Sequence, residues 1–553
     1  MQELYGRGVS NGIAIGKLFY YSNGNDIIPK NNIKDTEQEL LKYRKGMELA
    51  KQKLEQLYKS ANECVSENES MIFQMHIMIL EDSKFVSMVE NNIKNKKMNA
   101  AYAVHSTAIN LANIFKELDD DYLQERCYDI IDAAKTLIEI LLKKDNSQRI
   151  SNEPVIIAAD DLLPSETISF KKDCLLGFIT NQGSQNSHSA ILARTMGVPS
   201  VVQIDKPLAK YNGMTTILDG QLGKVIIDPD RGTLALYHAK KERYNKQQAT
   251  LKRQAGLESV TKNGQKITLS ANVGVLEDIT NAKANDAEGI GLFRSEFLFL
   301  RRKSCPNEDE QFEAYKAALK SDKKHKTIIR TVDLGADKEI EYLDLPHEKN
   351  PAMGFRGTRI CLANKEFFKI QLRALYRASV YGKLRILLPM VNGPEAIEYV
   401  QRIISEVKAE LKANGQPYSN DVELGITIET PASAIIADKL CPMVDFVSIG
   451  TNDLTQYMLA IDRENQKLEY FYEPYHLSLL RIIKFIAENA HKSGKWISIC
   501  GELASDITLT ELFLALGIDE LSMVPSKILK VRAKVRSVDT SNPSEILKKY
   551  NLA

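Results

Sequence analysis

The chain has 553 residues, with 73 lysines and arginines against 72 aspartates and glutamates, so its formal net charge is +1. A chain of this length predicts about three to five domains. Hydrophobic residues make up 44% and charged residues 26%, a globular balance that excludes disordered and collagen-like classes. The near-zero charge gives no reason to expect a nucleic acid or a membrane surface as partner. We expect no membrane insertion, because no apolar run reaches the ~20 residues of a spanning helix.

The cysteine pattern indicates the compartment. Seven cysteines are scattered along the chain without a Cys-x-x-Cys pair, which favours reduced thiols over a disulfide framework or a zinc site. The first residues have no signal-peptide pattern. We therefore expect a soluble, multidomain, cytoplasmic protein.

The first 232 residues read as an α/β unit with an insertion. Glycines divide residues 1–21 into short β-like runs, and residues 153–228 alternate short strands with Gly, Pro and Asp turns. Between them, residues 34–144 have few Gly or Pro and show apolar residues at helical spacing, which predicts a bundle or helical hairpins. We expect a discontinuous α/β domain over 1–21 and 145–232, and a helical insert over 22–144.

The rest of the chain predicts a barrel. A polar helical linker is expected over 233–259, followed by a domain over 260–553. Eight apolar strand candidates lie in that domain, several of them separated by helical patterns, which predicts a (β/α)₈ TIM-type barrel. The candidates are 266–273, 289–294, 327–334, 384–391, 423–430, 446–453, 497–502 and 521–524.

Polar residues collect near the C-terminal ends of these strands, where such barrels carry their chemistry. Arg294 and Arg330 suit the clamping of a phosphate or carboxylate. Glu429 and Asp453 suit a hard divalent ion. Together they indicate a phosphorylated anion handled through a bridging Mg²⁺. Cys500 could donate a proton or be a small buried side chain, and composition alone favours the second.

A second candidate lies in the α/β unit. His188 stands at the start of an apolar helix, after the polar turn Gly183-Ser184-Gln185-Asn186-Ser187. A helix N-terminus suits a phosphoryl group, and an imidazole nitrogen could hold one covalently. Without context, a histidine that merely begins a helix is the commoner case.

Longer motifs resemble a known family. The segment from Gly183 to Arg194 is similar to the phosphohistidine signature of the Enzyme I family of the bacterial sugar phosphotransferase system, the phosphoenolpyruvate-protein phosphotransferases. The resemblance covers nearly the whole chain. It extends through the segments 289–298, 330–338, 350–356, 426–431, 448–457, 460–463 and 498–502. A looser match, 73–82 with His76, looks like a helix of the family's phosphocarrier-binding domain.

The resemblance implies a mechanism. His188 would accept the phosphoryl group of phosphoenolpyruvate and pass it to the phosphocarrier protein HPr, as the first step of sugar uptake. Cys500 would protonate the enolpyruvate, and Glu429 and Asp453 would hold Mg²⁺. The α/β unit would be the phosphohistidine domain, the insert would bind HPr, and the barrel would form a homodimer. The substrate-binding set would be Arg294, Arg330, Asn452 and Arg463, with Lys338 and Arg356 as helpers.

Some positions depart from the family pattern, and three alternative functions remain. The departures are Ser184, Gln185, Asn186, Ala336 and Leu163. A pyruvate phosphate dikinase or phosphoenolpyruvate synthase would need an ATP-binding domain, for which no Gly-rich segment or spare length is present. A nonenzymatic regulatory relative would be expected to lose His188, Cys500 or the metal acids, and a nitrogen-branch relative would carry an extra sensory domain.

Overall fold

The computed structural model forms two compact units, residues 1–248 and 249–553. It describes the whole chain apart from residues 22–27, 32, 65–66, 117–120, 144–152, 163–165, 167–169, 171–173, 184–189, 191–192, 195, 277, 301, 303, 322–325, 336–339, 344, 346–347, 464 and 553. Each unit has its own hydrophobic clusters.

In the first unit, an eight-stranded sheet has the order β1-β8-β7-β3-β4-β5-β6-β2. The N-terminal strands therefore pair with strands more than 130 residues away, such as β3 with β4 in parallel. Side chains of β4 alternate between two buried clusters, because successive residues of a strand point to opposite faces. The strands are β1 (Gln2–Tyr5), β2 (Arg7–Ser10), β3 (Ile13–Tyr20), β4 (Val155–Ala159), β5 (Leu175–Thr180), β6 (Ser200–Val202), β7 (Thr215–Asp219) and β8 (Lys224–Ile227).

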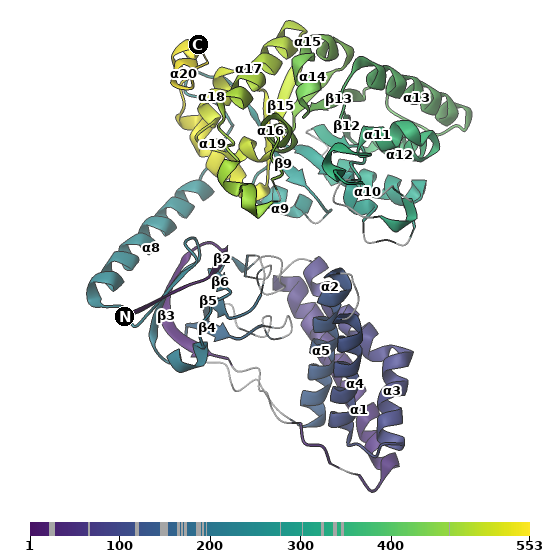
Figure 1. Cartoon of the computed structure of the whole chain (residues 1–553), viewed down its shortest axis with the longest axis vertical. Coiled ribbons are helices and arrows are strands. Elements are labelled where there is room, and N and C mark those ends of the chain that lie inside the picture. Colours follow the sequence, from purple (N-terminus) through teal and green to yellow (C-terminus); the bar gives the residue numbers. More distant parts are fainter. Residues whose placement is uncertain are drawn as a thin grey trace. The chain divides into compact units, whose positions relative to one another are not determined.

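Helices fill the long connection between β3 and β4 (Figure 1). Their apolar faces share one core, as amphipathic helices in a bundle do. His76 is fully buried there, with its ring nitrogens 3.9 and 4.0 Å from the carboxylates of Asp129 and Asp132. The helices are α1 (Thr36–Cys64), α2 (Glu67–Glu81), α3 (Ser83–Lys94), α4 (Ala100–Lys116) and α5 (Asp121–Leu141).

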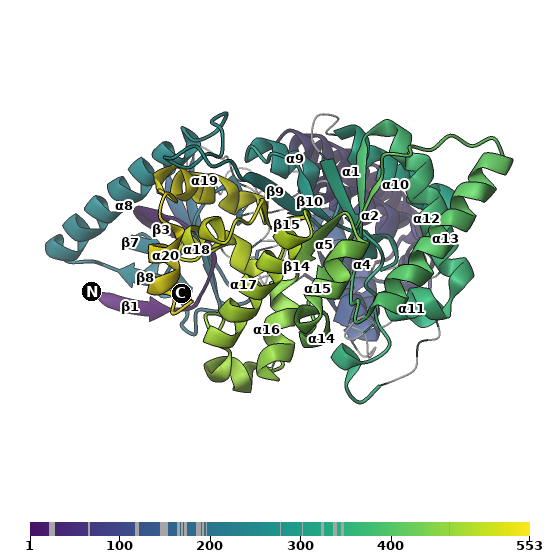
Figure 2. The same cartoon turned by 90° about the horizontal axis from the view of Figure 1, so that it is seen from above.

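The second unit is a closed barrel of eight parallel strands (Figure 2). It follows α8 (Arg231–Lys252), a helix that overlaps the predicted linker of 233–259 and begins two residues before it. The strands are β9 (Thr268–Val273), β10 (Ile290–Arg294), β11 (Lys326–Arg330), β12 (Lys383–Leu388), β13 (Glu423–Ile428), β14 (Phe446–Ile449), β15 (Trp496–Ile499) and β16 (Glu520–Met523).

Helices surround the strands, and most of the buried apolar side chains lie between the two layers. A smaller cluster, which contains Ile328, Leu387, Phe446 and Cys500, comes from residues at alternate positions and lies inside the barrel. The larger helices are α9 (Asp278–Ala284), α10 (Glu308–Ser321), α12 (Lys365–Ala378), α13 (Pro394–Ala413), α16 (Thr451–Leu459), α17 (Leu477–Lys492), α19 (Ile528–Ser537) and α20 (Pro543–Lys549).

The predicted fold class is confirmed, and the predicted strand ends need correction. Several predicted strands run two to four residues past the real ends, as at β11 and β14. Those residues form the turns that carry polar side chains, so strand hydrogen bonding stops before them. Among the helices that the structure describes, none is long and apolar enough to cross a membrane.

Candidate active site

One cavity of about 270 Å³ opens in the barrel, and eight of the ten residues proposed from the sequence line it. The other two, His188 and Lys338, lie outside the described residues, as do the departures Leu163, Ser184, Gln185, Asn186 and Ala336. The eight are Arg294, Arg330, Arg356, Glu429, Asn452, Asp453, Arg463 and Cys500.

The C-terminal ends of neighbouring strands bring these side chains together. Arg294 and Arg330 are the last residues of β10 and β11, and Glu429 and Cys500 directly follow β13 and β15. The strand prediction was wrong for Asp453, because β14 ends at Ile449 and α16 begins at Thr451, so Asp453 lies on a helix. Its carboxylate therefore occupies the first turn of a helix, where the helix dipole favours negative charge.

Arg330 is fixed by two acids. Its Nη2 lies 3.0 Å from Glu296 Oε1 and its Nη1 lies 3.1 Å from Asp333 Oδ2. The Glu296 carboxylate also accepts the backbone N–H of Asp333 at 2.8 Å. Burial alone would lower the pKa of Arg330, but Glu296, Asp333 and Glu429 outweigh it and raise that pKa. The cation is therefore permanent, and its buried Nε has no hydrogen-bond partner among the described residues.

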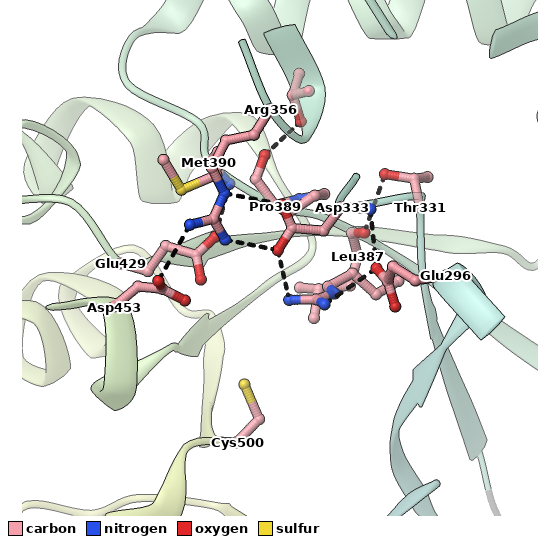
Figure 3. A network of polar contacts seen from close by, with 12 residues as sticks. Glu296, Thr331, Asp333, Arg356, Leu387, Pro389, Met390, Glu429, Asp453 and Cys500 are labelled. Atoms are coloured by element: carbon pink, nitrogen blue, oxygen red, sulfur yellow. Dashed lines mark hydrogen bonds and ion pairs between the residues drawn. The ribbon is translucent and has the colours of Figure 1, made fainter. Parts of the chain in front are cut away.

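Arg356 links two acids across the cavity (Figure 3). Its Nη2 lies 2.9 Å from Asp333 Oδ2, and its Nη1 lies 3.3 Å from Asp453 Oδ1. The same Nη1 donates a hydrogen bond to the Tyr457 hydroxyl at 3.3 Å. A single guanidinium thus holds the carboxylates of two separate βα loops in register.

Glu429 is a buried acid with two other carboxylates close by. Its exposed fraction is 2%, and its Oε1 accepts the Met390 backbone N–H at 2.7 Å. Burial, followed by the charges of Asp453 and Asp333, raises the pKa of Glu429 to about 8. Gly450 makes room for it, since a β-carbon there would lie 2.6 Å from Glu429 Oε2. A buried carboxylate beside another one attracts a proton or a metal cation.

Three further polar groups border the cavity. Arg294 and Arg463 are exposed, and within the described part of the chain neither makes an ion pair, so both cations are available to a ligand. Asn452 is held by Glu502, whose backbone N–H donates to Asn452 Oδ1 at 2.7 Å. That bond orients the amide at the rim.

Cys500 lies on the wall of the cavity, apart from the ion-pair network (Figure 3). It is 7% exposed, and its thiol lies 3.7 Å from the Ile449 carbonyl oxygen, to which it donates. Burial raises the pKa of Cys500 to about 11, against a hydrogen bond from Ser448 that lowers it. At neutral pH the sulfur therefore carries its proton, which is the form that a proton donor needs.

The sequence reasoning missed Glu296 and Asp333, the acids that position the arginines. Both lie inside segments quoted for the family resemblance, 289–298 and 330–338, so the signal was an acid two to three residues beyond each strand-end arginine. Nothing in the strand pattern told which acid faces which arginine.

The segment before His188 is anchored by described residues. Gln203 Nε2 donates to the Gly183 carbonyl oxygen at 3.0 Å, and the Thr180 hydroxyl donates to the Gln182 carbonyl oxygen at 2.6 Å. Asn181 Nδ2 donates to the carbonyl oxygens of Ile204 and Lys206, at 2.6 Å each. The start of the turn is therefore held against the chain that follows β6.

Similarity to known proteins extends over nearly the whole chain. Three family profiles of phosphoenolpyruvate-utilising enzymes match it: the N-terminal domain over residues 5–126, the mobile domain over 151–223 and the phosphoenolpyruvate-binding domain over 248–540.

Relatives that match over nearly their full length include proteins named phosphoenolpyruvate-protein phosphotransferase. The protein of that name from Staphylococcus carnosus is 39% identical over 547 residues, which are 99% of this chain and 96% of the relative. The one from Listeria monocytogenes is 40% identical over 545 residues, 98% of this chain and 95% of the relative. An NMR structure of an Enzyme I protein, 35% identical, covers 44% of this chain and 99% of its own, with a TM-score of 0.39.

Proposed function

The chain belongs to the phosphoenolpyruvate-protein phosphotransferases, and we propose that its barrel cavity is where phosphoenolpyruvate gives up its phosphoryl group. It is a transferase that moves this group to a phosphocarrier protein, which we identify as HPr. The observation that carries the proposal is the convergence of four arginines, three acids, an amide and a thiol on one cavity.

The substrate is a small polyanion, and the cavity offers cations of two kinds. Arg294 and Arg463 are unpaired among the described residues and can bind a phosphate or a carboxylate directly. Arg330 and Arg356 are held by acids, so they present fixed charges that need no rearrangement when charge develops in the transition state. Asn452 supplies a neutral donor beside them, and Lys338 belongs to the same set by family resemblance.

The acids fit a divalent cation. Burial, and then the two neighbouring carboxylates, raise the pKa of Glu429 and disfavour its charged form, and a dication would reverse that balance. Among the described residues, no three acid, histidine or cysteine side chains form a ready cluster, so oxygens of the substrate would complete the shell of Glu429 and Asp453. Mg²⁺ bound there would neutralise charge on the phosphoryl oxygens.

The thiol of Cys500 supports the second half of the reaction. When the phosphoryl group leaves, the substrate remainder is an enolate of pyruvate. Cys500 is protonated at neutral pH and borders the same cavity, so it can deliver a proton to the methylene carbon of that enolate. Pyruvate is then the product.

We assign His188 as the acceptor of the phosphoryl group, by the family resemblance of residues 183–194. The anchored turn before it supports this assignment, because a nucleophile needs a defined position. The acceptor belongs to the first unit and the cavity to the second, so the mechanism needs His188 to visit the cavity and then leave it.

The helical insert supplies a surface for HPr. A groove of about 550 Å³ is lined by apolar residues of α2, α3, α4 and α5. Met78 is 69% exposed and Ile114 is 46% exposed, although both are large and apolar. Apolar side chains gathered in a groove favour a protein partner. Asp82 and Lys84 at its border add polar contacts that would orient HPr.

The homodimer and the cytoplasmic location are also part of the proposal. Tyr470 is 94% exposed and the adjoining Phe471 is 62% exposed, which supports self-association through the barrel. Cys305, Cys361, Cys441 and Cys500 are free thiols, which supports a reducing compartment.

One experiment tests the function as a whole. The purified chain is incubated with phosphoenolpyruvate, Mg²⁺ and HPr, and both pyruvate and phosphorylated HPr are measured. We expect equal amounts of the two products. Pyruvate without phosphorylated HPr would contradict the assigned carrier, and neither product would contradict the activity.

A further inference from the structure

The proton-donor cysteine has a hydroxyl pair beneath it that no part of the mechanism above has used. Strands β14 and β15 run in parallel, and their register places Phe446 beside Trp496 and Ser448 beside Ser498. The rings of Phe446 and Trp496 stack inside the barrel, with their centroids 4.4 Å apart. Ser448 and Ser498 lie two residues further along each strand, so their side chains point to the same face of the strands as the two rings.

The second rung of this ladder is made of hydroxyls. Ser498 Oγ donates a hydrogen bond to Ser448 Oγ at 2.8 Å, and the two serines are 1% and 0% exposed. Cys500 directly follows β15, two residues after Ser498, and the Ser448 hydroxyl lowers the pKa of its thiol against burial. The chain of contacts is therefore Ser498 to Ser448 to Cys500.

The direction of the hydrogen bonds gives this chain a polarity. A hydroxyl has one hydrogen to donate. Because Ser448 accepts the hydrogen of Ser498, its own hydrogen is left for the sulfur. The apolar side chains packed with Cys500 inside the barrel are Leu292, Ile328, Leu387 and Phe446. The Ser448 hydroxyl is therefore placed to donate to the sulfur, while the thiol donates to the Ile449 carbonyl oxygen at 3.7 Å.

We propose that Ser448 and Ser498 are positioning residues for the proton transfer from Cys500, an inference that depends on the function proposed above. In that step the S–H bond breaks, and the proton forms the third C–H bond at C3 of the enolate with the electron pair of its C=C bond. The enolate oxygen becomes the carbonyl of pyruvate, and the sulfur keeps the S–H electron pair as a thiolate. Ser448 then donates to that thiolate, which solvent reprotonates after product release.

The energetic reason is the burial of the sulfur, which raises the pKa of Cys500 against the charges of Arg330 and Arg294. A buried thiolate is unfavourable, and a hydrogen bond to a charged group is stronger than a neutral one. The hydroxyl pair therefore stabilises the product side of the proton transfer more than the resting thiol.

The test is Ser448→Ala and Ser498→Ala in the full-length chain, with Ser270→Ala as matched control. Ser270 is a buried serine of β9 that hydrogen-bonds Glu520 and not Cys500. We expect kcat for pyruvate formation to fall about 10- to 100-fold in the two test variants, with less than a twofold change in KM, and no change in the control. Ser498→Ala decides the matter if Ser448→Ala does not fold.

A stereochemical readout separates positioning from general damage. Phosphoenolpyruvate with one deuterium at C3 in a known geometry is converted in tritium-labelled water, and the configuration of the methyl group of pyruvate is determined. The parent and Ser270→Ala should give one configuration. The two test variants should give a mixture, because enolate that waits too long is protonated by water. The proposal would be overturned if both test variants kept the kcat of the parent, or if both gave pyruvate with a single methyl configuration.

Cys500→Ala in the same assay distinguishes an error in this inference from an error in the proposed function. If it gives a mixture while the serine variants keep one configuration, only the role of the serines is wrong. If Cys500→Ala itself keeps one configuration, Cys500 is not the donor and the proton step above is wrong as well.

Discussion

The guanidinium of Arg356 lies 3.3 Å from the carboxylate of Asp453, so one of the two proposed Mg²⁺ ligands already has a counter-charge. The same guanidinium lies 2.9 Å from Asp333. Burial would lower the pKa of Arg356, but Asp333 and Asp453 outweigh that and raise it, so this charge is permanent. A cation that binds Asp453 must therefore compete with Arg356 or displace it.

Arg356→Gln should strengthen Mg²⁺ binding in the absence of substrate, by about tenfold or more, because a neighbouring positive charge is removed from a buried acid. Turnover should fall at the same time, since one cation for the substrate is lost. Calorimetric titration with Mg²⁺ measures the first effect. Arg359→Gln is the control, because Arg359 donates to the backbone of Met353 and Gly354 instead. Weaker Mg²⁺ binding in Arg356→Gln would contradict the competition.

Glu429 predicts a pH dependence of Mg²⁺ binding. Its folded-state pKa is raised to about 8 from 4.5, so below pH 8 a proton occupies the carboxyl and Mg²⁺ must displace it. Binding should therefore strengthen from pH 6 to pH 9 and release a proton near neutrality. The stability that this protonated group gives the metal-free barrel is fully present below pH 4.5 and is lost as the pH rises through 8.

Glu429→Gln should flatten that profile and, like Asp453→Asn, raise the Mg²⁺ needed for activity or abolish turnover. Glu398→Gln in α13 removes an exposed carboxylate outside the cavity and should change nothing. The measurement is activity against Mg²⁺ concentration at several pH values. If both acid variants kept the Mg²⁺ dependence of the parent, the metal site would lie elsewhere.

The sequence predicted the barrel and the set of cavity residues because both depend on local patterns. Apolar runs that alternate with helical segments predict βα units, and the C-terminal ends of parallel strands meet at one end of the barrel. Arg294, Glu429 and Cys500 could therefore be placed together without a structure. The same reasoning put Asp453 on a strand, since an apolar run does not show where strand pairing stops.

What the sequence could not show was which side chains face each other across strands. Glu296 binds Arg330 from the loop of the preceding strand, and Ser498 bonds Ser448 through the β14–β15 register. Such pairs depend on register and on which face of the strand is inward. A one-residue shift in strand register would turn these side chains to the opposite face of the strand, and no local sequence pattern reveals the register.

His188→Ala should fold but take no acid-labile phosphate from phosphoenolpyruvate, because the nucleophilic nitrogen is removed. Labelling with phosphoenolpyruvate that carries radioactive phosphorus, followed by acid treatment, measures this. His238→Ala is a suitable control, since His238 lies exposed on α8. Undiminished labelling of His188→Ala would disprove the assignment.

Met78→Asp should slow phosphate exchange with HPr by about tenfold or more, because a charge enters the apolar groove of the helical insert. Labelling by phosphoenolpyruvate should stay at the level of the parent, since the barrel is untouched. Leu41→Asp is the control, because Leu41 is 67% exposed on α1 but does not line the groove. Equal exchange rates in the parent and Met78→Asp would show that HPr docks elsewhere.

Separating the two units tests whether the reaction needs both. A fragment that ends near Glu258 keeps His188 and the helical insert but lacks Arg294, Glu429 and Cys500. It retains the sheet and bundle cores of the first unit, so it should fold. We expect it to exchange phosphate with phosphorylated HPr at a rate close to that of the full chain. With phosphoenolpyruvate and Mg²⁺ it should be inactive, because every residue proposed to bind that substrate is in the missing unit.

The same fragment with His188→Ala should be inactive in both assays. Phosphorylation of the unaltered fragment by phosphoenolpyruvate alone would mean that the barrel cavity is not the substrate site, and that His188 need not move between two partners.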